Sequence, residues 1–150
     1  MAIDKTAVIG FPVDHSLSPI IHNHWIKELA LDIKPYEKLN VDPNMFEEQM
    51  NNLKAEGFGG INVTVPLKEL AFNISDETSN VSKKLRSANT LTLSSDKINA
   101  DNTDAVGFIN SLDKKTIEEN ITNKKTLVLG AGGSARSVVY ALNELGSQVR

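Results

Sequence analysis

The stretch "LVLGAGGSARSVV" at Leu127–Val139 is the clearest indication of fold in this sequence. A β-rich run leads into a glycine-rich turn, and a helical pattern follows over Ser134–Leu145. Gly130, Gly132 and Ala135 match the spacing G-x-G-x-x-G/A between a strand and a helix. In that spacing the first glycine permits a tight turn, the second lets a ligand approach the backbone, and a small third residue keeps helix and strand close.

The turn has two interpretations, an unoccupied α/β turn and a phosphate site. The free N–H groups and the positive dipole end of the helix suit the diphosphate of a dinucleotide. We therefore expect cofactor binding by six residues: Gly130, Ala131, Gly132, Gly133, Ser134 and Ala135. A nucleoside-triphosphate loop is disfavoured because no Gly-Lys-Ser/Thr follows. The residue that distinguishes NAD from NADP lies about 20 or more residues past the first glycine, so these 150 residues do not encode that choice.

Upstream of this stretch, short β-rich runs alternate with helical patterns, which predicts βαβ units and a mainly parallel sheet. The expected strands are Thr6–Phe11, 34–41 and 61–65, the expected helices are Pro19–Leu31, Pro43–Glu56, 67–74 and 77–86, and residues 88–102 form a hairpin joined near Ser95 and Asp96. A further helix begins near Thr103, and the polar stretch Asp113–Lys125 is predicted to be a linker or domain boundary.

Apolar residues at helical spacing predict which faces of the first two helices are buried. Ile21, Trp25 and Leu29 form the apolar stripe of the first helix, and the inward-facing residues of the second are Met45, Phe46, Met50 and Leu53. The predicted fold class is therefore α/β, with a mainly parallel α/β domain over residues 1–105. Residues 106–150 are predicted to form a connecting helix and the first βα unit of a second domain.

The composition excludes several functions. The chain has 40% hydrophobic and 23% charged residues, typical of a soluble globular protein. A net charge of −3 argues against nucleic acid as a partner, and the absence of cysteine removes disulfides, thiol catalysis and thiolate metal sites. There is no apolar run of roughly 20 residues for a membrane span and no signal-peptide pattern. We expect a cytoplasmic protein without a membrane partner.

The stretch "VDHSLSPIIHNHW" at Val13–Trp25 combines serines with histidines. Ser18 followed by proline is a good N-cap pair, and Ser16 nearby fits either a cap or a seat for an anion such as a carboxylate. His22 and His24 point in nearly opposite directions on a helix, so no metal site is expected and the histidines are interpreted as packing or surface residues.

Two further stretches carry polar side chains at element ends. In "INVTVPLKE" the polar residues Asn62 and Thr64 interrupt an apolar strand and are candidates to line a cleft. Lys68 follows; from the residues alone it is by default a surface lysine. In "DNTDA", Asp104 either favours the helix dipole or holds a lysine ammonium for proton transfer.

Taken together, the stretches "GFPVDHSLSPIIHN", "GINVTVPLKE", "ANTL", "DNTDAVGF" and "VLGAGGSARSV" resemble the shikimate dehydrogenase family, which includes shikimate/quinate dehydrogenases. The resemblance implies a substrate-binding domain followed by the start of a Rossmann dinucleotide-binding domain. It also implies three groups of site residues: carboxylate-binding Ser16 and Ser18, Thr64 and Asn89 on the carboxylate or ring hydroxyls, and the catalytic pair Lys68 and Asp104. The glycines that flank D-N-T-D in the family are Ala100 and Ala105 here, which predicts a different local geometry.

The activity implied by the resemblance is the reversible reduction of 3-dehydroshikimate to shikimate in the chorismate and aromatic amino acid pathway. The implied cofactor is NADP, with NAD not excluded, and the implied assembly is a monomer or homodimer. Two alternatives stay open. One is a relative that oxidises quinate or another polyol acid, and the other is a substrate-binding fragment without turnover.

Overall fold

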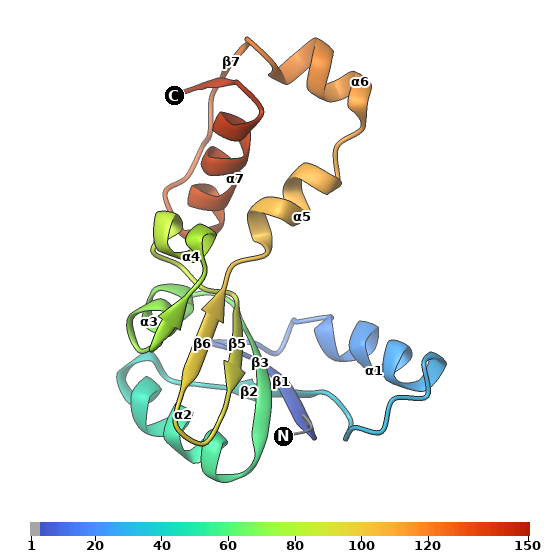
Figure 1. Cartoon of the computed structure of the whole chain (residues 1–150), viewed down its shortest axis with the longest axis vertical. Helices are drawn as coiled ribbons and strands as arrows, with labels where there is room; N and C mark the ends of the chain where they lie inside the picture. The colour runs from blue at the N-terminus through green and yellow to red at the C-terminus, as the bar shows by residue number, and fades with distance from the viewer. Residues whose placement is uncertain (1–3) are drawn as a thin grey trace. The chain divides into compact units, whose positions relative to one another are not determined.

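The structure of the chain, a computed structural model, describes residues 4–150. These residues divide into two compact units, and the boundary lies between Asp101 and Asn102. Figure 1 shows the elements of each unit along the chain, from the blue first strand to the red last helix.

The first unit is built on a six-stranded sheet with the order β2-β1-β3-β5-β6-β4. The strands are β1 (Lys5–Gly10), β2 (Glu37–Asn40), β3 (Phe58–Val63), β4 (Glu77–Thr78), β5 (Thr90–Leu93) and β6 (Ile98–Asp101). β1 pairs in parallel with β2 and β3, and β4 with β6, whereas β5 is antiparallel to β3 and β6. The α/β class with a mainly parallel sheet is therefore confirmed, and the predicted hairpin is the β5–β6 pair.

Helices lie on both faces of this sheet (Figure 1). They are α1 (Ser18–Glu28), the short 3-10 helix η1 (Pro43–Met45), α2 (Phe46–Ala55), α3 (Lys68–Asn73) and α4 (Asn80–Leu85). α2 and α3 contribute to the main core, in which Phe46, Met50 and Leu67 pack with the sheet residues Ile9 and Leu91. Strand register explains this core, because Ala7, Ile61 and Leu91 lie in one cross-strand row and side chains alternate between faces.

The opposite face of the sheet carries a smaller cluster against α1. Val8, Val13 and Tyr36 are buried there, and Ile26 of α1 packs against them. His22 of α1 stacks on the ring of Tyr36, with the ring centroids 4.2 Å apart and the planes 8° from parallel. The interpretation of His22 as a packing residue is confirmed.

The predicted apolar stripe of α1 is not buried. Ile21, Trp25 and Leu29 are 45%, 52% and 65% exposed, because α1 turns its other side, with His22 and Ile26, toward the sheet. Met45 is likewise 43% exposed and was wrongly predicted to face inward, because it lies in the preceding 3-10 helix, where the helical spacing of α2 does not apply.

The second unit contains α5 (Asp104–Asn110), α6 (Lys114–Thr116), a π-helical turn η2 (Ile117–Ile121), β7 (Lys125–Thr126), α7 (Gly133–Glu144) and β8 (Gln148–Val149). β7 and β8 form a short parallel pair. The predicted strand that leads into the glycine turn ends early: β7 stops at Thr126, and Leu127 and Leu129 beyond it are 69% and 88% exposed. Within the described residues β7 has β8 alone as partner, so a fully covered strand does not form.

Three other expectations were wrong. The stretch Asp113–Lys125 is mostly helical instead of a linker, and the Asp113 carboxylate caps its first helix by accepting from the Thr116 N–H at 2.8 Å. The expected strand 61–65 is displaced, because β3 begins at Phe58, includes Gly59 and Gly60, and ends at Val63. The short strand β4 within the predicted helix 77–86 was missed, because two residues carry no periodicity.

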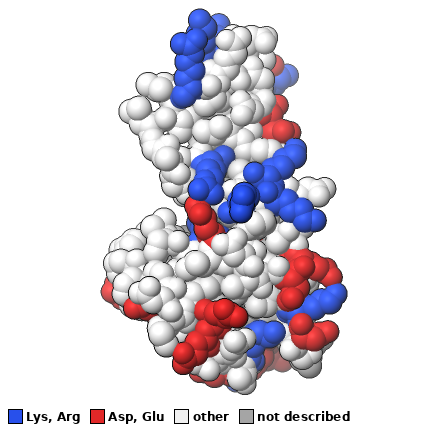
Figure 2. All heavy atoms as spheres, turned by 90° about the vertical axis from the view of Figure 1, so that its left-hand side faces the viewer, with Lys and Arg blue, Asp and Glu red and all other residues white. Residues whose placement is uncertain are grey.

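Charged side chains of both signs lie near one another on the face drawn in Figure 2. Among the described residues, Lys34 pairs with Asp4 at 2.8 Å and Lys97 with Glu77 at 2.6 Å, and both pairs are more than half exposed. Exposed pairs of this kind contribute little to stability. The fold therefore depends on the two apolar clusters of the first unit more than on these ion pairs.

The stacked His22 predicts a pH dependence of stability. Burial lowers the pKa of His22 below its ordinary value of 6.5, so the folded chain binds this proton less readily than the unfolded chain does. The free energy of unfolding should therefore fall as the pH drops through 6.5 toward the folded pKa. His22→Phe keeps a stacked ring without titrating, and urea unfolding followed by circular dichroism should show a smaller loss of stability in this variant on acidification. An equal loss in both proteins would contradict the prediction.

Candidate active site

The ends of β1 and β3 are held together by backbone hydrogen bonds that continue past the strands. The Thr64 N–H donates to the Ile9 carbonyl at 2.9 Å, and the Phe11 N–H donates to the Val65 carbonyl at 3.1 Å. The approach is so close that a Cβ on Gly10 would lie 2.6 Å from Cγ2 of Thr64. Thr64 is thereby fixed at the carboxyl end of β3, the edge where ligands bind in open α/β sheets.

Lys68 and Asn89 are attached to the same edge. Lys68 is the first residue of α3, and its carbonyl accepts from the Ala88 N–H at 2.9 Å. The Asn89 carbonyl accepts from the Val63 N–H at 2.8 Å. Backbone bonds therefore bring Thr64, Lys68 and Asn89 together, although 25 positions separate the first and the last.

Lys68 is 9% exposed, so its interpretation as a surface residue is wrong. A buried ammonium is costly unless it serves a partner or a function. The lysine is therefore a buried charged residue at the sheet edge to which Thr64 and Asn89 also belong.

Ser16 and Ser18 lie together at the start of α1. Their hydroxyl oxygens are 3.2 Å apart and hydrogen-bonded, and the Ser18 N–H donates to Oγ of Ser16 at 3.3 Å. The prediction that Ser18 is the N-cap is wrong. Leu17 occupies the N-cap position with helical backbone angles, and Ser18 is the first residue of the helix. Oγ of Ser16 accepts from the Ser18 N–H. Two hydroxyls that share one hydrogen bond keep one O–H proton for a ligand, so the pair suits a carboxylate.

The loop before these serines is tied to the end of β2. Oδ1 of Asn40 accepts from the Val13 N–H at 2.9 Å, and Nδ2 of Asn40 donates to Asp14 at 3.3 Å. Nζ of Lys38 donates to the Asp14 carbonyl at 2.5 Å. β2 therefore positions the serine loop, a role for Asn40 and Lys38 that the sequence did not indicate.

Asp104 belongs to the second unit, where it is the first residue of α5. Its N–H donates to Oδ1 of the buried Asn102 at 3.0 Å. The side chain of Asn102 thus makes a capping contact at the start of α5. Asp104 and Lys68 belong to different units, so their pairing stays a prediction.

The alanines that replace the family glycines fit without strain. Ala100 is buried in β6 and Ala105 is buried in α5. Among the described non-glycine residues, positive φ occurs at Ala30, Arg86 and Asn123 and not at these two. The altered geometry predicted for this motif is therefore not seen in the backbone.

The glycine turn has the geometry that its spacing predicts. Gly130 has φ of +129°, a region that favours glycine, and a Cβ there would lie 3.9 Å from Cβ of Ala135. Gly132 is the N-cap of α7, and no heavy atom would lie within 4 Å of a Cβ placed on it. The turn is therefore tight and open at the N-terminus of a twelve-residue helix, as a diphosphate requires.

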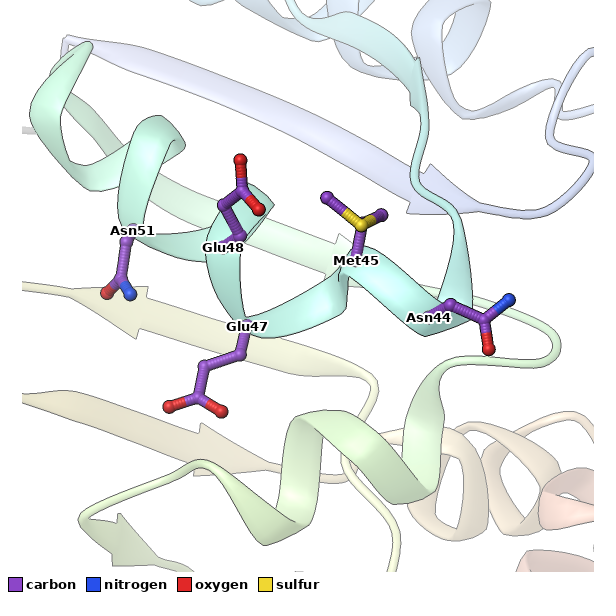
Figure 3. Close-up of a pocket in the computed structure, with 5 residues that line it drawn as sticks. All are labelled: Asn44, Met45, Glu47, Glu48 and Asn51. Carbon is purple, nitrogen blue, oxygen red and sulfur yellow. The ribbon is translucent and has the colours of Figure 1, made fainter.

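A separate hollow of about 430 Å³ lies over η1 and α2, and it is lined by Asn44, Met45, Glu47, Glu48 and Asn51. Figure 3 shows these side chains pointing in different directions instead of converging. None of the predicted site residues lines this hollow, and it offers no lysine or hydroxyl. We do not assign it to the active site.

The sequence did not indicate which residues hold Tyr36. Asn23 clamps its backbone, accepting from the Tyr36 N–H at 2.7 Å and donating to the Tyr36 carbonyl at 3.1 Å. The Tyr36 hydroxyl donates to Oδ1 of Asn62 at 2.6 Å. One sequence feature could have indicated this contact. The polar residue Asn23 lies on the side of α1 away from the apolar residues that were predicted to be buried.

The fold and these residues define a class: an α/β unit with a polar, lysine-bearing sheet edge, followed by a strand, glycine turn and helix of the dinucleotide-binding type. A family model described as "Shikimate dehydrogenase substrate binding domain" matches residues 8–91. The chain therefore belongs to the shikimate dehydrogenase family.

Individual relatives agree with this assignment. Shikimate dehydrogenase (NADP(+)) of Pelagibacter ubique is 42% identical over 138 residues, which are 92% of this chain and 51% of that protein. The crystal structure of shikimate dehydrogenase from Aquifex aeolicus matches with a TM-score of 0.89 at 39% identity, covering 98% of this chain and 54% of that one.

A crystal structure of shikimate 5-dehydrogenase from Thermus thermophilus, in complex with NADP(H) and shikimate, matches with a TM-score of 0.82 at 32% identity. It covers 98% of this chain and 54% of that one. The chain thus spans about half the length of the relatives it matches. No helix of the described residues is both long and apolar enough to cross a membrane.

The contact between Gly10 and Thr64 yields a prediction about stability. Gly10→Ala places a methyl group where Cγ2 of Thr64, 2.6 Å away, must move, and such overpacking costs about 1–3 kcal/mol. We expect urea unfolding to show a loss of this size. Gly107→Ala is the matched control, because a Cβ at Gly107 meets no heavy atom within 4 Å. Similar stabilities for the two variants would contradict the close approach.

Proposed function

We propose that this chain supplies the substrate-binding domain, and the first βα unit of the cofactor domain, of an NADP-dependent shikimate dehydrogenase. The reaction is the reversible reduction of 3-dehydroshikimate to shikimate. The observation that carries the proposal is the burial of Lys68 at the sheet edge that also holds Thr64 and Asn89. A lysine so placed, with hydroxyl and amide groups around it, suits a polyhydroxylated carboxylic acid.

The substrate carboxylate is bound by Ser16 and Ser18 in this proposal. Their mutual hydrogen bond of 3.2 Å leaves one hydroxyl proton to donate. Thr64 and Asn89 add a hydroxyl and an amide for the carboxylate or the ring hydroxyls. Several fixed contacts on one small ring set its orientation, which lowers the entropic cost of reaching the reactive geometry.

Lys68 is the proton donor in the direction of reduction. When hydride reaches the ring ketone, the oxygen becomes an alkoxide, and the Lys68 ammonium stabilises that charge and transfers one proton to it. In the reverse direction neutral Lys68 accepts the hydroxyl proton. Asp104, from the start of α5, is proposed to orient the ammonium and to bind a neighbouring hydroxyl.

The turn Gly130–Ala135 is proposed to hold the diphosphate of the cofactor. The positive φ of Gly130 and the open space at Gly132 fit this group, and the N-terminus of α7 provides N–H donors. When bound, the reduced nicotinamide supplies the hydride. NADP is favoured because the relatives are named as NADP(+) enzymes.

Several finer points stay predictions. They are the domain limits near residue 105, the selectivity for shikimate over quinate, the monomeric or homodimeric state and the cytoplasmic location. The motifs of the first unit support a shikimate-like substrate, because the positions of its serines, Thr64 and Lys68 all match the family pattern.

Lys68→Ala in the full-length protein tests the proposed chemistry. Removing the proton donor should lower kcat by about 10²- to 10⁴-fold, the usual range for acid–base groups, while shikimate still binds. Steady-state kinetics at saturating NADP+ give kcat, and calorimetry of the variant gives shikimate binding.

Lys83→Ala is the control, since Lys83 is an exposed lysine in the last turn of α4. It should keep normal turnover. Near-normal turnover in Lys68→Ala would refute the assignment of Lys68 as the proton donor.

A further inference from the structure

Tyr36 carries a buried hydroxyl group that the proposed mechanism does not use. The residue is 5% exposed, and its O–H donates to Oδ1 of Asn62 at 2.6 Å. Burial raises the pKa of Tyr36, so the group stays protonated and acts as a donor. Asn23 and His22 of α1 fix its backbone and its ring. Tyr36 is therefore a rigid hydrogen-bond donor aimed at the sheet.

The contact continues across the sheet to a proposed substrate residue. Asn62 of β3 and Thr90 of β5 are cross-strand partners, and Nδ2 of Asn62 lies 3.5 Å from Oγ1 of Thr90, the longest step of the series. Oγ1 of Thr90 then donates to Oδ1 of Asn89 at 3.0 Å. Tyr36, Asn62, Thr90 and Asn89 form a relay, and we use that name for these four residues.

The buried tyrosine proton sets the direction of the relay. If the Asn62 amide were flipped, its NH2 group would face the tyrosine oxygen, and the Tyr36 proton would lose the acceptor that it has in the described chain. A buried donor without an acceptor is costly. The Asn62 oxygen therefore faces Tyr36, its NH2 group faces Thr90, and the Thr90 proton goes to the Asn89 oxygen.

We propose that Tyr36 is a positioning residue that acts through Asn62 and Thr90 to orient the amide of Asn89. The Asn89 oxygen is turned toward Thr90 and its NH2 group away from it. That end of the amide recognises a ligand oxygen that accepts a hydrogen bond, such as a ring hydroxyl or ketone oxygen. The proposal rests on the proposed function, in which Asn89 contacts the substrate.

The test uses three variants of the full-length protein: Tyr36→Phe, Thr90→Val and the double variant. Each single change removes one hydroxyl and keeps the shape of the side chain. We expect the KM for shikimate to rise about threefold to tenfold, the range for one hydrogen bond, with kcat within about twofold and the KM for NADP+ unchanged. Because both changes break one relay, the double variant should be no worse than the worse single variant.

Thr92→Val is the matched control. Thr92 lies on β5 two residues from Thr90, on the same face, and is exposed, so its loss should leave KM unchanged. A KM for shikimate that rises in Tyr36→Phe but not in Thr90→Val would overturn the relay. Losses that multiply in the double variant would also overturn it, because they would mean two independent effects.

A second readout separates failure of the relay from failure of the proposed function. The side-chain NH2 resonances of Asn89 in ¹H–¹⁵N spectra should shift in Tyr36→Phe, because hydrogen bonds in a connected series polarise one another, and stay unchanged in Thr92→Val. If the wild-type protein neither binds nor oxidises shikimate, the proposed function fails while this shift still supports the relay. Unchanged Asn89 resonances in both Tyr36→Phe and Thr90→Val would refute the relay itself.

Discussion

The parallel pairing of β1 with β3, extended past the strand ends by Thr64 N–H to Ile9 and Phe11 N–H to Val65, is the constraint on which the site depends. Glycine at position 10 suits this close approach, because a Cβ there would lie 2.6 Å from Cγ2 of Thr64 and would displace it. With these two chain ends fixed, α3 begins with Lys68 beside Thr64, and the Val63–Asn89 bond attaches β5. A local backbone arrangement thus gathers side chains from segments that lie far apart in the sequence.

The two faces of the sheet have different roles. One face is apolar and forms the main core through Ile9, Ile61 and Leu91. The other carries Asn62 and Thr90 in neighbouring strands, and these polar groups are satisfied by each other and by Tyr36. Hydrogen bonds in a connected series among partly buried side chains favour one arrangement of those side chains. The polar face can therefore support a binding site without weakening the core that holds it.

The sequence predicted the strands and helices with strong periodicity or clear turn residues, such as β1, α2 and the β5–β6 hairpin, and it located the glycine turn correctly. It failed where tertiary packing overrides pattern. The apolar stripe of α1 was assigned to the wrong side because periodicity shows which residues share a face and not which face meets the sheet. The family resemblance supplied the site residues. The burial of Lys68 and the contacts of Tyr36 and Asn40 depend on segments far apart in the chain, so no local pattern revealed them.

The proposed function places the substrate at the edge formed by the ends of β1 and β3. A crystal structure of the full-length protein with shikimate tests it most directly. We expect the carboxylate on the hydroxyls of Ser16 and Ser18, and a ring oxygen within about 2.7–3.2 Å of Nζ of Lys68, the range of a hydrogen bond. Shikimate bound at another surface, or Lys68 out of contact with a ring oxygen, would contradict it.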